Sequence, residues 1–259
     1  MIFLSFDIEE FDNPLPYTQT INFEQQMSIS KLGTTRILNL LFQKDVKATF
    51  FCTANFAMNA TDLIDRMVNE GHEVASHGYY HAKFEIKDLK ESKDVLEHLT
   101  GRTVFGFRMP NMKPVNAMAI IDAGYQYNSS LNPTFLPGKY NNLNKPRRIF
   151  YEGALCQVPA SVSSLLRIPL FWLSLHNFPL SLYKRMCIGA IKKDGYLNVY
   201  FHPWEFADLS APEVKLPSYI VRNSGNVLIN RLGDVIDSFK HKKYLFGTLK
   251  ECCNLFPKD

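Results

Sequence analysis

Short apolar runs that end in polar residues recur along the chain, and they constrain its fold more than any other feature. The run Ile2 to Phe6 leads into Asp7, the run Glu73 to Ser76 leads into His77, and a run at 104–107 follows the same pattern. Continuous apolar runs of this length are typical of parallel strands buried on both faces. The carboxyl ends of parallel strands lie at one edge of a sheet, so polar residues that follow them gather there. The pattern predicts an α/β fold with a parallel sheet closed or curled around one site.

Helical patterns separate these runs. Helices are expected at about 28–42, 61–70, 86–99, 115–122, 179–193 and 227–239. Ser28 or Ser30 is the expected start of the first helix, and Thr61 and Gly71 are the expected cap and stop of the second. Further strands are expected at 47–52, 125–130, 154–158, 197–201 and 244–246. The alternation amounts to about seven β/α units.

The length of the chain favours a single domain. α/β barrels commonly occupy about 250 residues without splitting, so we expect one domain over residues 1–259. A loop-rich insertion is expected at about 132–183, where six prolines occur, and a long loop over the barrel mouth is expected at 12–27. Hydrophobic residues make up 46% of the chain, which is enough for a sizeable core.

Composition excludes several classes of protein. The net charge of +4 is small, and the basic run Lys145 to Arg148 is interpreted as a solvated loop, so no nucleic-acid partner is indicated. Five cysteines without CxxC spacing indicate reduced thiols. The N-terminus lacks the features of a signal peptide, so a cytoplasmic location is expected. The stretch Leu165 to Leu175 is too short to span a membrane and is interpreted as a buried helix, the alternative being an apolar flap near a lipid-linked substrate.

Two histidines four residues apart form a candidate metal site with the acidic run near the N-terminus. If His77 and His81 lie on a helical turn, their side chains share one face about 6 Å apart. Imidazole suits zinc, cobalt or nickel, and one carboxylate from the run Asp7 to Asp12 would complete a set that leaves positions open for water and substrate. Histidine pairs at this spacing also arise by chance on protein surfaces and then bind nothing.

Five short segments in order resemble the motifs of polysaccharide deacetylases of the NodB-homology type, carbohydrate esterase family four. They are Ser5–Glu9, Ser76–His81, Phe107–Pro110, Tyr127–Ser130 and Val199–Pro203. The Asp-x-Glu opening and the His-Pro-Trp-Glu ending resemble a subgroup often found beside capsule or exopolysaccharide synthesis functions. The resemblance implies a distorted (β/α)7 barrel, similar to a TIM barrel. It also implies a metal-dependent hydrolase that removes N-acetyl groups from amino sugars of a polysaccharide or its precursor, in capsule, exopolysaccharide or cell wall.

The resemblance also implies roles for individual residues. Glu9, His77 and His81 would hold a divalent metal, zinc in the first place, with cobalt or nickel as alternatives. Asp7 would be the general base. Ile8 stands where the family usually has a second aspartate, so the ligand role passes to the longer Glu9. If Glu9 points away, Asp7 itself must bind the metal and the base is lost.

Arg108 and His202 complete the expected catalytic set. Arg108 would pair with Asp7 and hold it ionised, the alternative being a surface arginine. His202 would protonate the leaving amine, the alternative being a packed core histidine. The family usually has an aspartate that orients this histidine, but Asn128 stands at that place, so activity is reduced or Glu205 or Asp208 substitutes.

Substrate contacts are expected from Tyr79, Pro110, Asn128 and Trp204, with an N-acetylated amino sugar or polysaccharide as the partner. For the aromatic residues, packing in the core or a loop is the alternative. Two other functions remain open at this point. One is a carbohydrate-binding protein of the same fold with impaired catalysis, and the other is a hydrolase of small non-sugar amides. The sequence leaves the sugar and the oligomeric state open.

Overall fold

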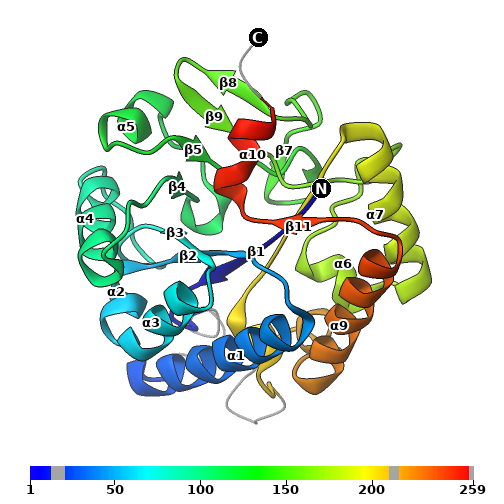
Figure 1. The fold of residues 1–259 in the computed structure, drawn as a ribbon, viewed down its shortest axis with the longest axis horizontal. Helices are drawn as coiled ribbons and strands as arrows, with labels where there is room; N and C mark the ends of the chain where they lie inside the picture. Colours follow the sequence, from blue (N-terminus) through cyan, green and yellow to red (C-terminus); the bar gives the residue numbers. More distant parts are fainter. Residues whose placement is uncertain (13–20, 210–215, 257–259) are drawn as a thin grey trace.

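The sheet is mostly parallel and curls into a distorted barrel (Figure 1). The computed structural model describes residues 1–12, 21–209 and 216–256. Seven parallel strands lie in the spatial order β10 (Leu197–Phe201), β1 (Ile2–Ile8), β2 (Thr49–Cys52), β3 (Glu73–Ser76), β4 (Gly106–Phe107), β5 (Tyr127–Asn128) and β9 (Leu155–Gln157). Beyond β9, the backbone N–H of Ser161 donates to the carbonyl of Asn198 in β10 at 2.8 Å, so the two ends of the sheet meet. The predicted α/β barrel class is confirmed.

Two further strands extend this sheet and one small hairpin lies apart from it. β8 (Phe150–Glu152) pairs antiparallel with β9, and β11 (Phe246–Gly247) pairs with the start of β1. A separate hairpin joins β6 (Phe135–Leu136) and β7 (Tyr140–Asn141). The expected insertion at 132–183 therefore contains local structure, which its proline content concealed.

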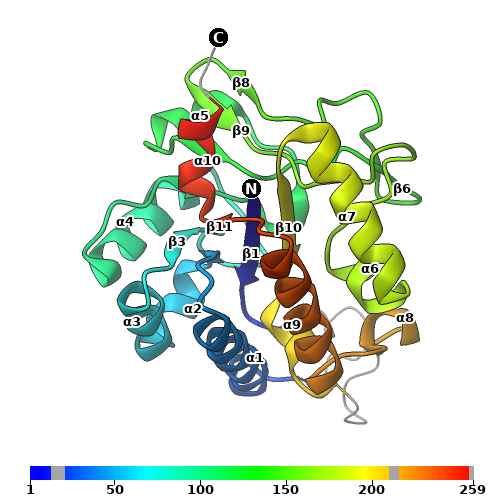
Figure 2. The ribbon, with the colours of Figure 1, turned by 45° about the vertical axis from the view of Figure 1, so that its right-hand side comes forward.

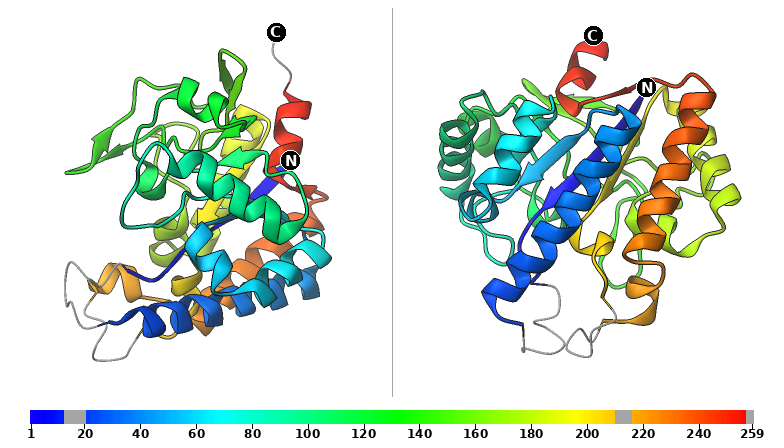
Figure 3. Two further views of the ribbon diagram at one scale, coloured as in Figure 1. Left: turned by 90° about the vertical axis from the view of Figure 1, so that its left-hand side faces the viewer. Right: turned by 60° about the horizontal axis from the view of Figure 1, so that its bottom comes forward.

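Helices surround the sheet in the views of Figures 1 and 2. They are α1 (Phe23–Lys44), α2 (Ala54–Met58), α3 (Thr61–Asn69), α4 (Asp88–Thr100), α5 (Ala117–Asp122), α6 (Trp172–Asn177), α7 (Leu180–Asp194), α8 (Ser218–Val221), α9 (Asn226–His241) and α10 (Leu249–Leu255), with 3-10 turns at Pro110–Met112 and Pro203–Phe206. The long helices α1 and α9 lie side by side on one flank (Figure 3), where Lys44 pairs with Asp237 at 2.5 Å. None of the described helices is long and apolar enough to cross a membrane.

The core has two main parts. The larger part lies between the sheet and its surrounding helices and includes Phe6, Leu38 and Phe201. The smaller part fills the barrel at the amino ends of the strands, where Phe3 and Phe51 pack with residues of α10. Because α10 covers that end beside the N-terminus (Figure 2), the carboxyl ends of the strands are left for a functional site.

The helix starts expected from the sequence were wrong in two places. α1 begins at Phe23, five residues before Ser28, because Asn22 and Gln25 form a capping box. Helix α1 therefore occupies the end of the expected loop at 12–27, and residues 13–20 of that prediction lie outside the described residues. Thr61 is not a cap, because Ala60 occupies the N-cap position of α3 without a side-chain hydrogen bond.

The stretch Leu165 to Leu175 is only partly the buried helix that was expected. Helix α6 begins at Trp172, and Leu175 within it is fully buried. Leu165 and Leu166 instead lie exposed in the loop before α6. Arg167 adopts a positive φ of 52° there, which a helix does not accommodate.

Candidate active site

A cavity of about 430 Å³ lies at the carboxyl ends of the strands. Polar residues on its lining include Asp7, Glu9, His77, His81 and His202. Asp7 lies within β1, His77 directly follows β3, and His202 directly follows β10. These residues are far apart in the sequence, and the parallel sheet brings them to one place because neighbouring strands end at the same edge.

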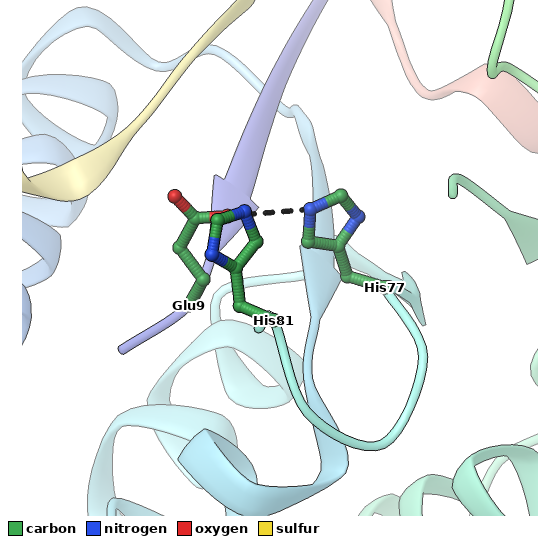
Figure 4. Close-up of side chains that lie close together, drawn as sticks. All are labelled: Glu9, His77 and His81. Atoms are coloured by element: carbon green, nitrogen blue, oxygen red, sulfur yellow. Dashed lines mark ion pairs between the residues drawn. The ribbon is translucent and has the colours of Figure 1, made fainter. Parts of the chain in front are cut away.

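Glu9, His77 and His81 converge on a common point (Figure 4). Glu9 Oε2 lies 3.3 Å from His77 Nε2 and 3.1 Å from His81 Nε2. The three residues are buried, and their donor atoms lie within 4.8 Å of one another. Glu9 Oε2 is shielded from solvent but has no hydrogen-bond partner. A buried carboxylate oxygen facing two imidazoles is the arrangement that a divalent cation would complete.

The outer nitrogens of both histidines are hydrogen-bonded, which orients the inner ones. His77 Nδ1 lies 2.8 Å from the carbonyl of Arg108, and His81 Nδ1 lies 2.7 Å from Asp12 Oδ1. Both partners are acceptors, so we assign a proton to each Nδ1. The Nε2 atoms are then the metal-binding atoms, and the outer partners fix the orientation of the rings. Asp12 was expected only as part of the acidic run, and no sequence signal assigned it to His81.

Electrostatics at this cluster favour positive charge. Burial raises the pKa of Glu9, but the nearby His81, His77 and His202 outweigh it and lower that pKa to about 2. Burial lowers the pKa of His81, but the charge of Glu9 and the hydrogen bond to Asp12 outweigh it and raise that pKa to about 9. In the isolated chain a proton on His81 therefore balances Glu9, and a bound cation would replace that proton.

The helical turn expected for the histidine pair was wrong. His77 to His81 lie in the loop after β3, and Gly78 has a φ of +79°, which interrupts helical geometry. The two imidazole rings are nonetheless 6.0 Å apart and within 20° of parallel. The loop brings them together at about the distance that a helix would have given.

Asp7 forms a buried ion pair with Arg108. Asp7 Oδ1 accepts from Arg108 Nη1 at 2.6 Å, and the Arg108 side chain is fully buried. Arg108 also donates from Nε to the carbonyl of Ser129 at 2.9 Å and from Nη1 to Ser5 Oγ at 3.0 Å. Its guanidinium carbon lies 4.1 Å from the centre of the Phe51 ring. These contacts hold Asp7 in one orientation, as a positioned base requires.

His202 lies near the Asp7 carboxylate oxygen that Arg108 does not contact. Its Nε2 lies 4.0 Å from Asp7 Oδ2, and its Nδ1 lies 2.7 Å from Glu205 Oε1. Burial lowers the pKa of His202, but the hydrogen bond to Glu205 and the charges of Glu9, Glu205 and Asp7 outweigh it and raise that pKa. A protonated His202 is therefore favoured beside the cavity.

A family relationship is found by comparison with known proteins. Residues 16–128 match the family model of polysaccharide deacetylases. A peptidoglycan deacetylase of Helicobacter pylori is 27% identical over 110 residues, which is 39% of this chain and 38% of that protein. Over this part of its length the chain is similar to polysaccharide deacetylases. The aligned segments span only between 24% and 38% of the lengths of the first three curated relatives.

Solved structures share the fold. A probable polysaccharide deacetylase from Pseudomonas aeruginosa superposes with a TM-score of 0.64 at 15% identity, over 96% of this chain and 88% of that one. The Puue allantoinase superposes with a TM-score of 0.62 at 16% identity, over 95% and 85% of the two chains. At these identities the likeness concerns the barrel itself.

The segment Tyr127–Ser130, the fourth of the five compared with the family, does not supply the carboxylate beside His202. Asn128 donates from Nδ2 to Gln157 Oε1 at 2.8 Å and accepts from Ser130, so its amide faces these residues. The carboxylate beside His202 belongs to Glu205, which was one of the two substitutes considered from the sequence. Glu205 is fully buried and also accepts from the backbone N–H of His202 at 2.6 Å.

A second histidine supports Glu205. His176 of α6 is fully buried, and its Nε2 lies 2.9 Å from Glu205 Oε2. Its Nδ1 lies 2.7 Å from the carbonyl of Arg222. Sequence reasoning missed His176 because a single histidine between leucine and asparagine, inside the stretch that was expected to be loops, carries no motif.

Of the four residues expected to contact substrate, one lines the described cavity. Trp204 lines the cavity, and its Nε1 donates to Glu9 Oε1 at 3.3 Å while its ring stacks 5.2 Å from that of His202. Tyr79, Pro110 and Asn128 are not among the described lining residues. Tyr79 packs its ring 4.8 Å from that of Tyr80 instead.

The aromatic wall of the cavity comes mainly from the second half of the chain. Its described members, which we call the aromatic wall, are Tyr140, Phe171, Trp172, Tyr200 and Tyr219. The Trp172 ring makes edge contacts with both His176 and His202 at 5.7 Å. Sequence reasoning included Tyr200 in a motif and an expected strand but named none of the five as a substrate contact, because an aromatic residue in a short element or loop carries no signal of its own.

Proposed function

We propose that this protein is a metal-dependent hydrolase that removes N-acetyl groups from amino sugars of a polysaccharide or its precursor. The observation that carries the proposal is the convergence of Glu9, His77 and His81 beside Asp7 and His202 in one cavity. Metal ligands, a positioned carboxylate and a protonated histidine are the parts that amide hydrolysis needs. The match of residues 16–128 to the family model of polysaccharide deacetylases supports the same chemistry.

The metal is proposed from the donor set. The unpartnered Glu9 Oε2 and the two Nε2 atoms fit a divalent ion, and two imidazoles with one carboxylate suit zinc, with cobalt or nickel as alternatives. Such an ion would polarise the amide carbonyl and lower the pKa of water. His77 and His81 would hold it through nitrogens that their outer partners already orient.

Asp7 is the proposed general base. It would take a proton from the attacking water, and the buried Arg108 would keep it ionised and pointing at the cavity. Glu9 is free for the ligand role because it reaches both histidines, so Asp7 need not bind the ion. This arrangement supports Glu9 as the ligand in place of the aspartate whose position Ile8 occupies.

His202 is the proposed general acid. It would give a proton to the amine nitrogen as the carbon–nitrogen bond breaks, and its raised pKa favours the protonated form that this step needs. Glu205 supplies the anion that Asn128 lacks. The presence of Asn128 is therefore no longer a reason to expect impaired catalysis. A carbohydrate-binding protein without activity is therefore the weaker alternative.

The cavity supports a sugar as substrate. An aromatic wall with polar groups at the floor is suited to a sugar ring, whose apolar face stacks on aromatic side chains. A volume of about 430 Å³ accommodates a small ligand or one end of a longer chain. The same volume favours, as a second candidate, the hydrolysis of a small non-sugar amide.

The deciding experiment measures metal content and acetate release from N-acetylglucosamine oligomers with the intact chain, His77→Ala and Asp7→Asn. We expect about one metal ion per chain in the intact protein and in Asp7→Asn, far less in His77→Ala, and strongly reduced acetate release in both variants. Metal retained in His77→Ala would contradict the proposed ligand set. Metal without acetate release in the intact chain would select either the binding protein or, if a free small amide is hydrolysed, the second candidate.

Asp7→Asn requires a stability control. It leaves the Arg108 cation buried without its partner, which destabilises a protein by several kcal/mol, about 3–5 in measured cases. Urea unfolding of each variant should therefore accompany the assay. Lost acetate release counts toward the base role only if Asp7→Asn remains folded and keeps its metal under assay conditions.

A further inference from the structure

Two neighbouring leucines stand exposed at the tip of the loop between β9 and α6. Leu165 is 86% exposed and Leu166 is 77% exposed. The loop is closed at its base by a bridge between Val162 and Pro169. We call residues 163–168 the leucine tip. Single exposed leucines are common on proteins, but an adjacent exposed pair in one short loop is less so.

Hydrogen bonds hold the leucine tip in shape. Within it, the N–H of Ser163 donates to the carbonyl of Ile168 at 2.7 Å, and the N–H of Ile168 donates to Ser163 Oγ at 2.9 Å. From outside, Thr134 Oγ1 donates to the carbonyl of Arg167 at 2.6 Å. The leucines are thus presented by a fixed backbone, and little ordering entropy would be lost if they contacted a partner.

Basic side chains donate hydrogen bonds to the backbone of the leucine tip. Lys193 Nζ donates to the carbonyl of Ser164 at 2.7 Å, and Arg147 donates to the carbonyls of Ser163 and Ser164 at 3.2 and 3.3 Å. Arg167, in the tip itself, donates to the carbonyl of Lys145 at 2.8 Å. The apolar pair is therefore surrounded by cations at its base.

The segment that contains this loop is more basic than the rest of the chain. Residues 139–194 contain nine Lys and Arg and two acidic residues, a net charge of +7, whereas the whole chain has 29 and 25, a net charge of +4. The remainder of the chain then carries 20 basic and 23 acidic residues, a net charge of −3. One of the two acids, Asp194, is buried against Arg147. Lys145, Lys192 and Lys193 are exposed.

We propose that the leucine tip docks this protein on an anionic lipid surface. The two leucines would enter the boundary between headgroups and acyl chains, while the surrounding lysines and arginines would contact the negative headgroups. Each contribution is weak alone, and stable peripheral binding generally needs two such signals together. The proposal is independent of the catalytic role, because it uses none of the residues at the active site.

The test is sedimentation of the full chain with vesicles of phosphatidylglycerol and phosphatidylcholine, compared with vesicles of phosphatidylcholine alone. We expect binding to the anionic vesicles that weakens as salt rises, and little binding to the neutral ones. The double variant Leu165→Ser with Leu166→Ser should bind about tenfold more weakly or worse. The matched control is Leu245→Ser, since Leu245 is 72% exposed but lies elsewhere, before β11, and this variant should bind like the intact chain.

A charge variant separates the two contributions. Lys145→Gln with Lys192→Gln should reduce binding and also reduce its dependence on salt, because fewer cations then meet the headgroups. Absence of binding to anionic vesicles would overturn the proposal, and so would equal binding by the double leucine variant and its control. A concentration-dependent dimer that the double leucine variant abolishes, without vesicle binding by the intact chain, would instead identify a second copy as the partner.

Discussion

The two halves of the chain build the active site in different ways. In residues 1–128, strand ends place the groups directly, since Asp7 lies within β1 and His77 follows β3 without an intervening residue. In the second half, His202 follows β10 but is held by a series of side chains, Glu205 and then His176. The family model matches residues 16–128 and does not extend over this second network. The comparison indicates that the metal and base side depends on the sheet, whereas the acid side depends on buried side-chain contacts.

The largest effect on activity is expected from His202→Gln, which removes the proposed acid and leaves the three proposed metal ligands in place. Loss of a general acid reduces the rate about 10²–10⁴-fold, so acetate release should fall by that factor. Metal content should not change, because His202 is not one of the three converging ligands. The assay is acetate release with metal analysis of the same sample.

A matched control for that variant is His98→Gln. His98 is exposed on α4, and its replacement should leave both acetate release and metal content unchanged. Loss of metal in His202→Gln would contradict the division into a metal side and an acid side. It would show that the second half also shapes the ligand set.

A smaller effect is expected from Glu205→Gln. The carboxylate of Glu205 raises the pKa of His202, so an amide in its place should let that pKa fall. Because the acid must be protonated to act, activity is lost as pH rises through its pKa. The high-pH limb of the kcat profile should therefore shift to lower pH in Glu205→Gln, with about tenfold lower kcat near neutral pH.

Glu205→Asp provides the comparison for this prediction. It retains the charge but shortens the side chain, so the high-pH limb should lie between those of Glu205→Gln and the intact chain. An unchanged pH profile in Glu205→Gln would mean that another group sets the protonation of His202. Metal content again should not change, because Glu205 does not contact Glu9, His77 or His81 through any described hydrogen bond.

The first half was largely predictable from sequence because its local signals agree with its fold. The strand at 73–76 was predicted with the bounds it has, and the strand at 2–6 was correct but two residues too short. Asp7, Glu9, His77, His81 and Arg108 were all named in advance, and the structure brings them together. Their roles stay predictions until they are tested. Even there, the geometry of the histidine pair was wrong, because a glycine at positive φ replaced the expected helical turn.

The second half was less predictable because long-range contacts determine its structure. Helix α6 has six residues and packs Leu175 and His176 into the interior, which a short irregular sequence does not reveal. The antiparallel β8 and the β6–β7 hairpin are two or three residues long, too short for a period to show. Glu205 could be proposed as a partner of His202 from its place three residues later, but no sequence signal leads from Glu205 to His176.

The smallest effect, and the finest test of the acid-side network, comes from His176→Phe. A carbonyl only accepts, so His176 Nδ1 donates to the carbonyl of Arg222, and its Nε2 lies within hydrogen-bond distance of Glu205 Oε2. Phenylalanine has a similar shape but no donors, so it would leave Glu205 Oε2 and the Arg222 carbonyl without these hydrogen bonds. Leaving buried acceptors unpaired costs about 1–3 kcal/mol, and the free energy of unfolding in urea should fall by that amount.

His176 also has an expected effect on activity that a purely structural residue would lack. Without His176, Glu205 loses the contact that orients it toward His202, so kcat should fall a few-fold and its pH profile should change while KM stays the same. His176→Gln retains one donor and should recover part of both losses. If stability falls in His176→Phe but kcat and its pH profile stay as in the intact chain, then Glu205 is positioned by the Pro203–Phe206 turn alone. The acid side would then be fixed by local backbone, without a contribution from a second buried histidine.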